Sequence, residues 1–277
     1  TLNVNYFHVV FTIPNELNIL CLMDPKFMYK ALFDVSAETI KELSKDKTYL
    51  GAKIGFTSVL HTWGQNLSLH PHIHMIVPGG GIDSNGKWKN SKKKFFLPVK
   101  VVSKLFKGKF LSYTKKNFDQ RKIKDEEQFQ NIINTCYSKD WVVYTKKPMK
   151  SAKHVVKYLG RYTHRIAISN ARIKKYEDNK VTFSYKDYSN HNQIKEMTLD
   201  DTEFFRRYMM HVLPSNFMKI HHYGFLGNRN KEERIKAIRT ATNTKDPGPF
   251  LIDYEQIISD ILKRDVSICI KCGQKRH

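Results

Sequence analysis

The sequence predicts an α+β fold, in which an antiparallel sheet is flanked by helices and followed by a C-terminal α/β extension. Apolar, β-branched and aromatic runs typical of buried strands occupy the first 80 residues and are interrupted by one long helical pattern. Two of these runs are joined by the short polar loop Gly64-Gln65-Asn66, which is typical of an antiparallel hairpin. Beyond residue 166 the pattern changes to short strand-like runs that alternate with helices.

The spacing of apolar side chains, together with Pro and Gly at the ends of the runs, predicts the N-terminal elements. The run from Tyr6 to Ile13 ends at Pro14 and predicts a buried strand, and apolar residues at helical spacing predict a helix over 26–43. Strands are expected at 54–63 and 72–77, the second stopped by Pro78 and three glycines. The remaining expected elements are helices at 98–118, 125–137, 151–162, 202–212, 230–240 and 252–263, and strands at 141–144, 181–185 and 193–198.

We expect two regions, 1–165 and 166–277. The first would carry the sheet, a basic helical insertion at about 84–138 and a helix at 151–165, and the second would be an accessory region. The chain is long enough for either one large domain or two smaller ones.

Charge points to a polyanionic partner. The 277 residues include 48 Lys and Arg against 26 Asp and Glu, a net charge of +22, which favours nucleic acid or an acidic membrane surface. No apolar run reaches the roughly 20 residues of a membrane span, and no leader is evident, so we expect no membrane partner. Acid-free basic stretches run over 84–118 and 141–176, and the first contains the candidate DNA contacts Lys92, Lys93 and Lys94. We expect the accessory region, 166–277, to bind DNA as well. Four scattered cysteines favour a reducing compartment such as the cytoplasm.

The histidines predict a metal site. His72 and His74 are two residues apart on an expected strand, so both imidazoles lie on one face. The hairpin would bring His61 beside them as a third ligand, with Gln65 as the alternative. No Asp or Glu occurs between Asp46 and Asp83, so the charge of a bound ion would remain available to a phosphate oxygen. Imidazoles suit transition ions, whereas Mg²⁺ prefers oxygen ligands.

Two tyrosines are candidate nucleophiles. Tyr158 and Tyr162 are four residues apart on an expected helix and share one face, among the cations Lys157, Arg161 and Arg165. A phenol has a pKa of about 10, so attack on phosphorus requires a base, a metal or nearby cations. The alternative is an aromatic stripe that packs on the sheet.

A family resemblance rests on four segments together. These are His70-Pro71-His72-Ile73-His74-Met75-Ile76-Val77-Pro78-Gly79-Gly80-Gly81, Phe95-Phe96-Leu97-Pro98-Val99-Lys100-Val101, Tyr158-Leu159-Gly160-Arg161-Tyr162-Thr163-His164-Arg165 and His222-Tyr223-Gly224-Phe225-Leu226. From about residue 6 to about residue 230 the chain resembles the two-tyrosine, rolling-circle transposases of the HUH endonuclease superfamily, of the bacterial insertion-sequence ninety-one type.

The resemblance implies a ferredoxin-like antiparallel sheet that carries the metal histidines beside a tyrosine helix. It implies that a divalent ion (Mg or Mn) assists nicking and transfer of single-stranded DNA at transposon ends, through a 5′-phosphotyrosine intermediate. The implied location is the bacterial cytoplasm, in association with the nucleoid. The sequence does not indicate an oligomeric state, nor which tyrosine acts first.

Two departures from the family pattern concern zinc. The cysteine-rich N-terminal segment of that family has no counterpart in these residues, and the start at Thr1 leads us to expect that a segment precedes it. At the other end, Cys269 and Cys272, with His277, resemble half of a structural zinc site.

Three other functions remain open on the sequence alone. They are a plasmid-type replication initiator, a non-catalytic single-stranded DNA-binding protein, and a histidine-triad nucleotide hydrolase, whose signature resembles residues 70–76. Pro71 fits that signature poorly, and an enzyme for small nucleotides has little use for a charge of +22.

Overall fold

The computed structural model describes residues 2–92, 97–123, 125–149, 167–188 and 190–245, with single positions at 248, 259, 265, 268 and 274. Contacts divide the chain into two units, Thr1–Thr244 and Lys245–His277, and the elements below belong to the first.

The strands are β1 (Tyr6–Thr12), β2 (Phe56–Trp63), β3 (Leu69–Pro78), β4 (Gly80–Ile82), β5 (Trp88–Asn90), β6 (Val143–Met149), β7 (Ile173–Glu177), β8 (Lys180–Asp187), β9 (Gln193–Asp200) and β10 (Ile220–Tyr223). The α-helices are α1 (Asn18–Met23), α2 (Pro25–Lys45), α3 (Val99–Asn117), α4 (Glu126–Ser138), α6 (Asp201–Met209) and α7 (Lys231–Ala241). Short 3₁₀ turns are η1 (Asn15–Leu17), η2 (Gln120–Lys122), η3 (Asn170–Arg172) and η4 (Gly224–Leu226).

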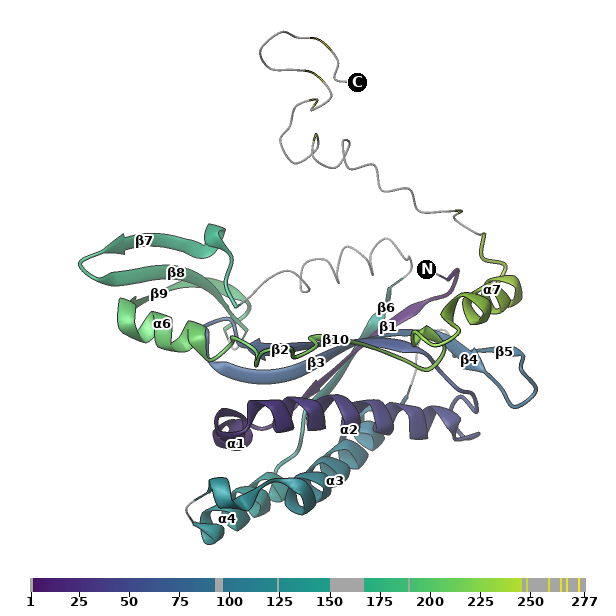
Figure 1. Cartoon of the computed structure of the whole chain (residues 1–277), viewed down its shortest axis with the longest axis horizontal. Coiled ribbons are helices and arrows are strands. Elements are labelled where there is room, and N and C mark those ends of the chain that lie inside the picture. The colour runs from purple at the N-terminus through teal and green to yellow at the C-terminus, as the bar shows by residue number, and fades with distance from the viewer. Residues whose placement is uncertain are drawn as a thin grey trace. The chain divides into compact units, whose positions relative to one another are not determined.

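A five-stranded sheet in the order β10-β2-β3-β1-β6 forms the centre of the unit, and every neighbouring pair in it is antiparallel (Figure 1). The mixed α+β class and the antiparallel sheet that the sequence predicts are therefore confirmed. The predicted hairpin is also confirmed, because β2 pairs directly with β3 across a five-residue loop, 64–68.

Helices α2 and α3 cover one face of this sheet (Figure 1). Pro25 occupies the first turn of α2, and the Asp24 carboxylate caps the helix by accepting from the Phe27 amide at 3.0 Å. From α2, Met28, Leu32 and Ile40 are fully buried in the main core. Their burial at helical spacing anchors α2 to the sheet.

The strands alternate strictly between this core and the other side of the sheet. On β3, Ile73, Met75 and Val77 are fully buried against the helices, whereas His72 and His74 lie on the opposite side and are half-buried. The same alternation places His8 of β1 and His61 of β2 on the side of His72 and His74. We call this side the histidine face.

A smaller sheet, β7-β8-β9, follows in the chain and packs with α6 around a second core (Figure 1). Its fully or nearly buried residues are Ala167, Val181, Phe183 and Phe204, joined by Leu67 from the β2–β3 loop. Leu67 has a φ of +62°, which is strained for a branched side chain. Its complete burial in the second core holds it in that conformation.

Most predicted boundaries agree with the structure to within a few residues, but four strands and one helix were not predicted. Strands β4, β5, β7 and β10 are three to five residues long, and α1 has six. Elements of this length carry too few side chains for a periodic pattern. The expected helices at 151–162 and 252–263, and the domain boundary expected near residue 165, lie outside the described residues.

None of the described helices combines the length and the apolar character needed to cross a membrane.

The turn after β10 depends on a glycine. Gly224 has a φ of +60°, and a Cβ there would lie 1.9 Å from the Ile54 carbonyl oxygen. We expect Gly224→Ala to lower the free energy of unfolding by more than about 2 kcal/mol, because it adds a steric clash to an unfavourable backbone conformation. Urea unfolding followed by circular dichroism measures the change.

Gly108→Ala is the matched control. Gly108 lies within α3, and a methyl group added there would meet none of the described residues within 4 Å. The substitution should stabilise the chain by roughly 0.5–1 kcal/mol through helix propensity. Equal effects of the two substitutions would contradict the role assigned to Gly224.

Candidate metal centre

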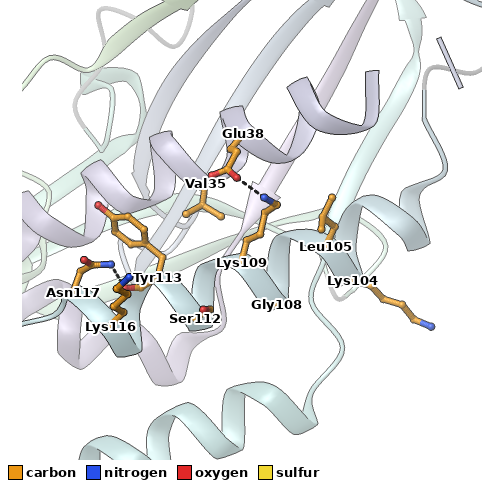
Figure 2. Close-up of a pocket in the computed structure, with 10 residues that line it drawn as sticks. All are labelled: Val35, Glu38, Lys104, Leu105, Gly108, Lys109, Ser112, Tyr113, Lys116 and Asn117. Carbon is orange, nitrogen blue, oxygen red and sulfur yellow. Dashed lines mark hydrogen bonds and ion pairs between the residues drawn. The ribbon is translucent and has the colours of Figure 1, made fainter. Parts of the chain in front are cut away.

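A surface hollow of about 570 Å³ lies between α2 and α3, in the helical layer and not on the histidine face (Figure 2). Its central cation, Lys109, contacts the carboxylates of Glu38 and, at 2.9 Å, Glu42, and these hydrogen bonds raise the pKa of Lys109. None of the described residues that line the hollow is a histidine or a cysteine. The central charges of the hollow are satisfied within the helix pair, which suits a structural role.

The pairing of the central strands brings three histidines together on the histidine face. His61 of β2 stands directly opposite His72 of β3, and His74 follows His72 by one repeat of the strand. One ligand nitrogen from each of His61, His72 and His74 lies within 4.8 Å of the others. Among the described residues this is the one group of three or more His, Cys, Asp or Glu side chains arranged to hold a metal ion.

The spacing of two of these nitrogens fits a common ion. The Nε2 atoms of His72 and His74 are 3.0 Å apart. Bonds of about 2.0–2.1 Å to one ion, at roughly a right angle, place two nitrogens about 3.0 Å apart. His72 and His74 therefore fit adjacent ligand positions, and His61 lies beside them as the third donor.

His72 and His74 are neutral at physiological pH, as metal ligands must be. Burial lowers the pKa of His72 to about 4, although the hydrogen bond to the His70 carbonyl opposes the shift. Burial also lowers the pKa of His74 well below its usual value, and nearby His72, His61 and His8 lower it further. These two histidines therefore offer uncharged donors, and the sequence places no carboxylate between Asp46 and Asp83.

A fourth histidine, His8, was not predicted. It lies on β1, is 4% exposed, and its Nε2 is 2.8 Å from Nδ1 of His74. The two rings are stacked, with centroids 5.1 Å apart and planes 13° apart. The sequence does contain a signal, since His8 is the one histidine in an otherwise apolar buried strand, but the pairing of β1 with β3 was needed to place it.

Trp63 supports the third histidine. Its ring stacks on His61 at 4.7 Å between centroids and 18° between planes, and the Lys219 ammonium lies 4.9 Å from the Trp63 ring centroid. These contacts restrict the rotation of the His61 ring. His61 itself is 2% exposed.

The alternative ligand, Gln65, has other partners. Its side-chain amide donates to the Tyr188 hydroxyl at 3.4 Å, and its backbone carbonyl accepts a hydrogen bond from Arg172. Both partners belong to the smaller-sheet region. By contrast, the His61 ring contacts the rings of both His72 and His74, so His61, and not Gln65, belongs with them.

The smaller-sheet region, residues 172–211, also binds the rest of the β2–β3 loop. Arg207 donates to the Asn66 carbonyl at 3.3 Å, and His211 Nε2 donates to the Leu67 carbonyl at 3.1 Å. The other nitrogen of His211 lies 3.3 Å from the Thr62 hydroxyl. Three successive loop carbonyls, 65 to 67, are therefore bound by side chains from 172–211, which fixes the hairpin that carries His61 and His72.

Of the predicted DNA contacts, Lys92 is exposed and lies just after β5, next to the end of β3 that is remote from His72. The other predicted functional residues lie outside the described residues: Tyr158, Tyr162, Lys157, Arg161, Arg165, Lys93, Lys94, Cys269 and Cys272.

Comparison with known proteins adds independent information. Residues 55–234 match the family model Y2_Tnp, which is described as "Putative transposase". A protein named "Putative transposase y4qJ" from Sinorhizobium fredii is 39% identical over 287 residues, which cover 99% of this chain and 72% of that protein. The "Transposase for insertion sequence element IS801" from Pseudomonas savastanoi pv. phaseolicola is 28% identical over 274 residues, covering 97% of this chain and 66% of that protein. No solved structure matches the chain.

The neutral histidines predict a pH-dependent stability. Because His72 has a folded-state pKa of about 4 and an unfolded value near 6.5, the unfolded chain binds more protons between these values. Stability is therefore fully present above about pH 6.5 and is lost as the pH falls toward 4, by on the order of 2 kcal/mol from this residue. Urea unfolding in a chelator at pH 7.5, 6.5, 5.5 and 4.5 measures the slope.

The control for this slope is the double variant His72→Gln, His74→Gln, which removes both buried imidazoles. We expect its stability to fall less steeply over the same interval. An unchanged slope would show that other groups cause the pH dependence.

Proposed function

The chain belongs to the Y2 transposase family, the two-tyrosine rolling-circle type, and on that premise we propose that it nicks and transfers single-stranded DNA by metal-dependent transesterification. The observation that carries the proposal is the convergence of His61, His72 and His74 on one face of a chain with a charge of +22. Such a site favours a phosphate over a neutral substrate.

The histidines would hold a divalent ion, which supplies Lewis-acid stabilisation of the charge that develops on the scissile phosphate. A set of three imidazoles suits Mn²⁺ better than Mg²⁺, because Mg²⁺ prefers oxygen ligands. With Mg²⁺, water and phosphate oxygens would need to complete the ligand sphere. We propose one of these two divalent ions, Mn²⁺ or Mg²⁺, as the ion that the site holds.

Tyr158 and Tyr162 are the proposed nucleophiles. In each transfer, a phenol oxygen forms a bond to phosphorus and loses its proton, while the bond from phosphorus to the 3′ oxygen breaks and that oxygen takes up a proton. The products are a 5′-phosphotyrosine and a free 3′-hydroxyl. Lys157, Arg161 and Arg165 would stabilise the phenolate and hold the DNA backbone, and a second tyrosine permits a second transfer while the first is occupied.

The histidine face also offers an aromatic contact for a base. Tyr144 of β6 pairs with Val10, and Val10 pairs with His74, so all three side chains point to the same side of the sheet. Tyr144 is 54% exposed. Exposed rings beside a phosphate site are typical of single-strand binding, because bases stack on them once they are unpaired.

The central experiment looks for a covalent adduct. Labelled single-stranded DNA carrying an element end is incubated with the protein and Mn²⁺ and then run on a denaturing gel. We expect an adduct with the wild-type protein, an altered adduct with Tyr158→Phe or Tyr162→Phe, and none with the double variant or with His72→Ala, His74→Ala. Tyr137→Phe is the matched control, because Tyr137 is an exposed tyrosine on α4, in the helical layer.

Each alternative function has a distinct outcome in this assay. DNA binding without any adduct indicates a non-catalytic binding protein, and an adduct only on plasmid-origin DNA indicates a replication initiator. Hydrolysis of small nucleotides in a chelator indicates a histidine-triad enzyme. An adduct that persists in the double tyrosine variant would refute the assigned nucleophiles.

Tyr144 allows a separate test of single-strand binding. Since stacking of a base on an aromatic side chain contributes about 1–3 kcal/mol, Tyr144→Ala should weaken single-stranded DNA binding by about tenfold and Tyr144→Phe should not. Fluorescence polarisation at a fixed salt concentration measures this. Equal affinities of the alanine variant and the wild type would remove Tyr144 from the proposed binding face.

A further inference from the structure

We propose that a hollow between the end of α2 and the β4–β5 hairpin binds a backbone phosphate of DNA, outside the histidine site. The hollow has a volume of about 260 Å³ and is lined by Thr48, Tyr49 and Leu50 on one side and by residues 89–92 on the other. We call it the lysine hollow. It rests on the proposed function, because that function makes DNA the ligand, but its test needs neither a metal ion nor strand cleavage.

Backbone pairing holds the two sides of the lysine hollow together. After α2 ends, the amides of Tyr49 and Gly51 donate to the Asp46 carbonyl at 3.1 and 2.9 Å and form a tight turn. Lys53 then bonds to Ile82 of β4 in both directions, at 2.7 and 2.8 Å, and β4 pairs with β5 (Figure 1). The turn after α2 and the end of the hairpin are therefore fixed next to each other.

Two lysines supply the charge of the hollow. The Lys89 ammonium lies over the turn, since a Cβ on Gly51 would be 3.1 Å from its nitrogen. Gly51 has a φ of +64°, so this glycine both permits the turn and leaves room for the ammonium. Lys92 is exposed and follows β5. Unlike Lys109 in the α2–α3 hollow, neither of these lysines forms an ion pair with any of the described residues.

The acidic residues nearest in sequence are used elsewhere. The lining comes from two stretches without Asp or Glu, 47–82 and 84–118. At their borders, the Asp46 carboxylate accepts from the Thr48 amide at 2.8 Å. The Asp83 carboxylate accepts from the amides of Asn85 and Lys87, both at 2.9 Å. The positive charge of the hollow is therefore left to attract an anion.

The size and the donors of the hollow suit a phosphate group. Its volume is below the roughly 300–1,000 Å³ of pockets that enclose a drug-sized ligand, so a whole metabolite is a poor fit. A lysine ammonium binds phosphate as a point charge. Ser91 in the lining adds a hydroxyl that can donate to a phosphate oxygen. One phosphate of a DNA backbone meets these conditions.

The position of the hollow suits DNA that also reaches the metal site. His72 and Pro78 are six residues apart on β3, which is about 20 Å along an extended strand. Directly after β3, the Gly79 carbonyl accepts from the Ser91 amide at 3.0 Å. The two sites would therefore hold phosphates several nucleotides apart on one DNA molecule. Such a contact sets the register of the DNA on the chain without reading its sequence.

The first test measures affinity in a chelator, where no strand transfer occurs. Lys89→Gln, Lys92→Gln should weaken binding of the single-stranded DNA of the adduct assay by about tenfold. The slope of log affinity against log salt concentration should become shallower by about 1, because a phosphate contact is lost. Lys89→Arg, Lys92→Arg keeps both charges and should bind within about threefold of the wild type. Fluorescence polarisation measures all three.

Lys115→Gln, Lys116→Gln is the matched control, because it removes the same charge from a distant surface. Both lysines are exposed in the last turn of α3. That end of α3 lies beside the start of α2, where Tyr113 stacks on Phe27. The lysine hollow follows the other end of this 21-residue helix, about 30 Å away. We expect this variant to bind DNA within about twofold of the wild type.

The second test locates the phosphate on the DNA. A neutral methylphosphonate replaces one backbone phosphate at a time. At a position several nucleotides from the scissile phosphate, we expect it to weaken binding to the wild type by about tenfold and to leave binding to Lys89→Gln, Lys92→Gln unchanged. This pattern identifies the phosphate that the two lysines hold.

The proposal is overturned if the double glutamine variant binds DNA as tightly as the wild type, if the control or the arginine variant weakens binding equally, or if no methylphosphonate position shows the expected difference. Saturable binding of inorganic phosphate, with unchanged DNA affinity of the glutamine variant, would assign the hollow to free phosphate. Urea unfolding checks each variant, and Lys92→Gln alone decides if the double variant does not fold. A chain that passes both tests but forms no adduct would refute the proposed nuclease and leave the lysine hollow standing.

Discussion

The register between β2 and β3 is the constraint on which the site depends. Ile73, Met75 and Val77 must face the helical layer, and this burial together with the five-residue loop 64–68 sets the register in which His61 stands opposite His72. A shift of one residue would turn the imidazoles into the apolar core and the aliphatic side chains out of it. Packing on α2 thus determines not only stability but also which nitrogens converge.

Two sets of contacts hold the β2–β3 hairpin, one along its strands and one at its loop. Along the strands, the main core fixes the faces, whereas at the loop the smaller-sheet region binds three successive carbonyls and encloses Leu67. The strained backbone of Leu67 is tolerated because its side chain is fully buried in the second core. The Trp63 ring stacks on His61 and the His8 ring stacks on His74, so two of the three candidate ligands are each held by a neighbouring ring.

Much of this arrangement could be predicted from the sequence, because its signals are local. Alternation on β3 places His72 and His74 on one face, and the short loop after Trp63 places His61 near them. His8 and Tyr144 could not be placed, since β1 and β6 join the sheet through long-range pairing that no periodic pattern encodes. Strand β10 has four residues and joins the edge of β2 from more than 150 positions away, which local propensity does not reveal.

The binding of the loop carbonyls by Arg172, Arg207 and His211 has a consequence for inheritance and engineering. The segments 56–78 and 167–223 are bonded to each other although they are far apart in the chain, and strand β10 adds a second connection between them. A chimera that takes one segment from a relative and keeps the other would mismatch donors and carbonyls at the loop. Recombination between relatives should therefore be tolerated best when both segments travel together.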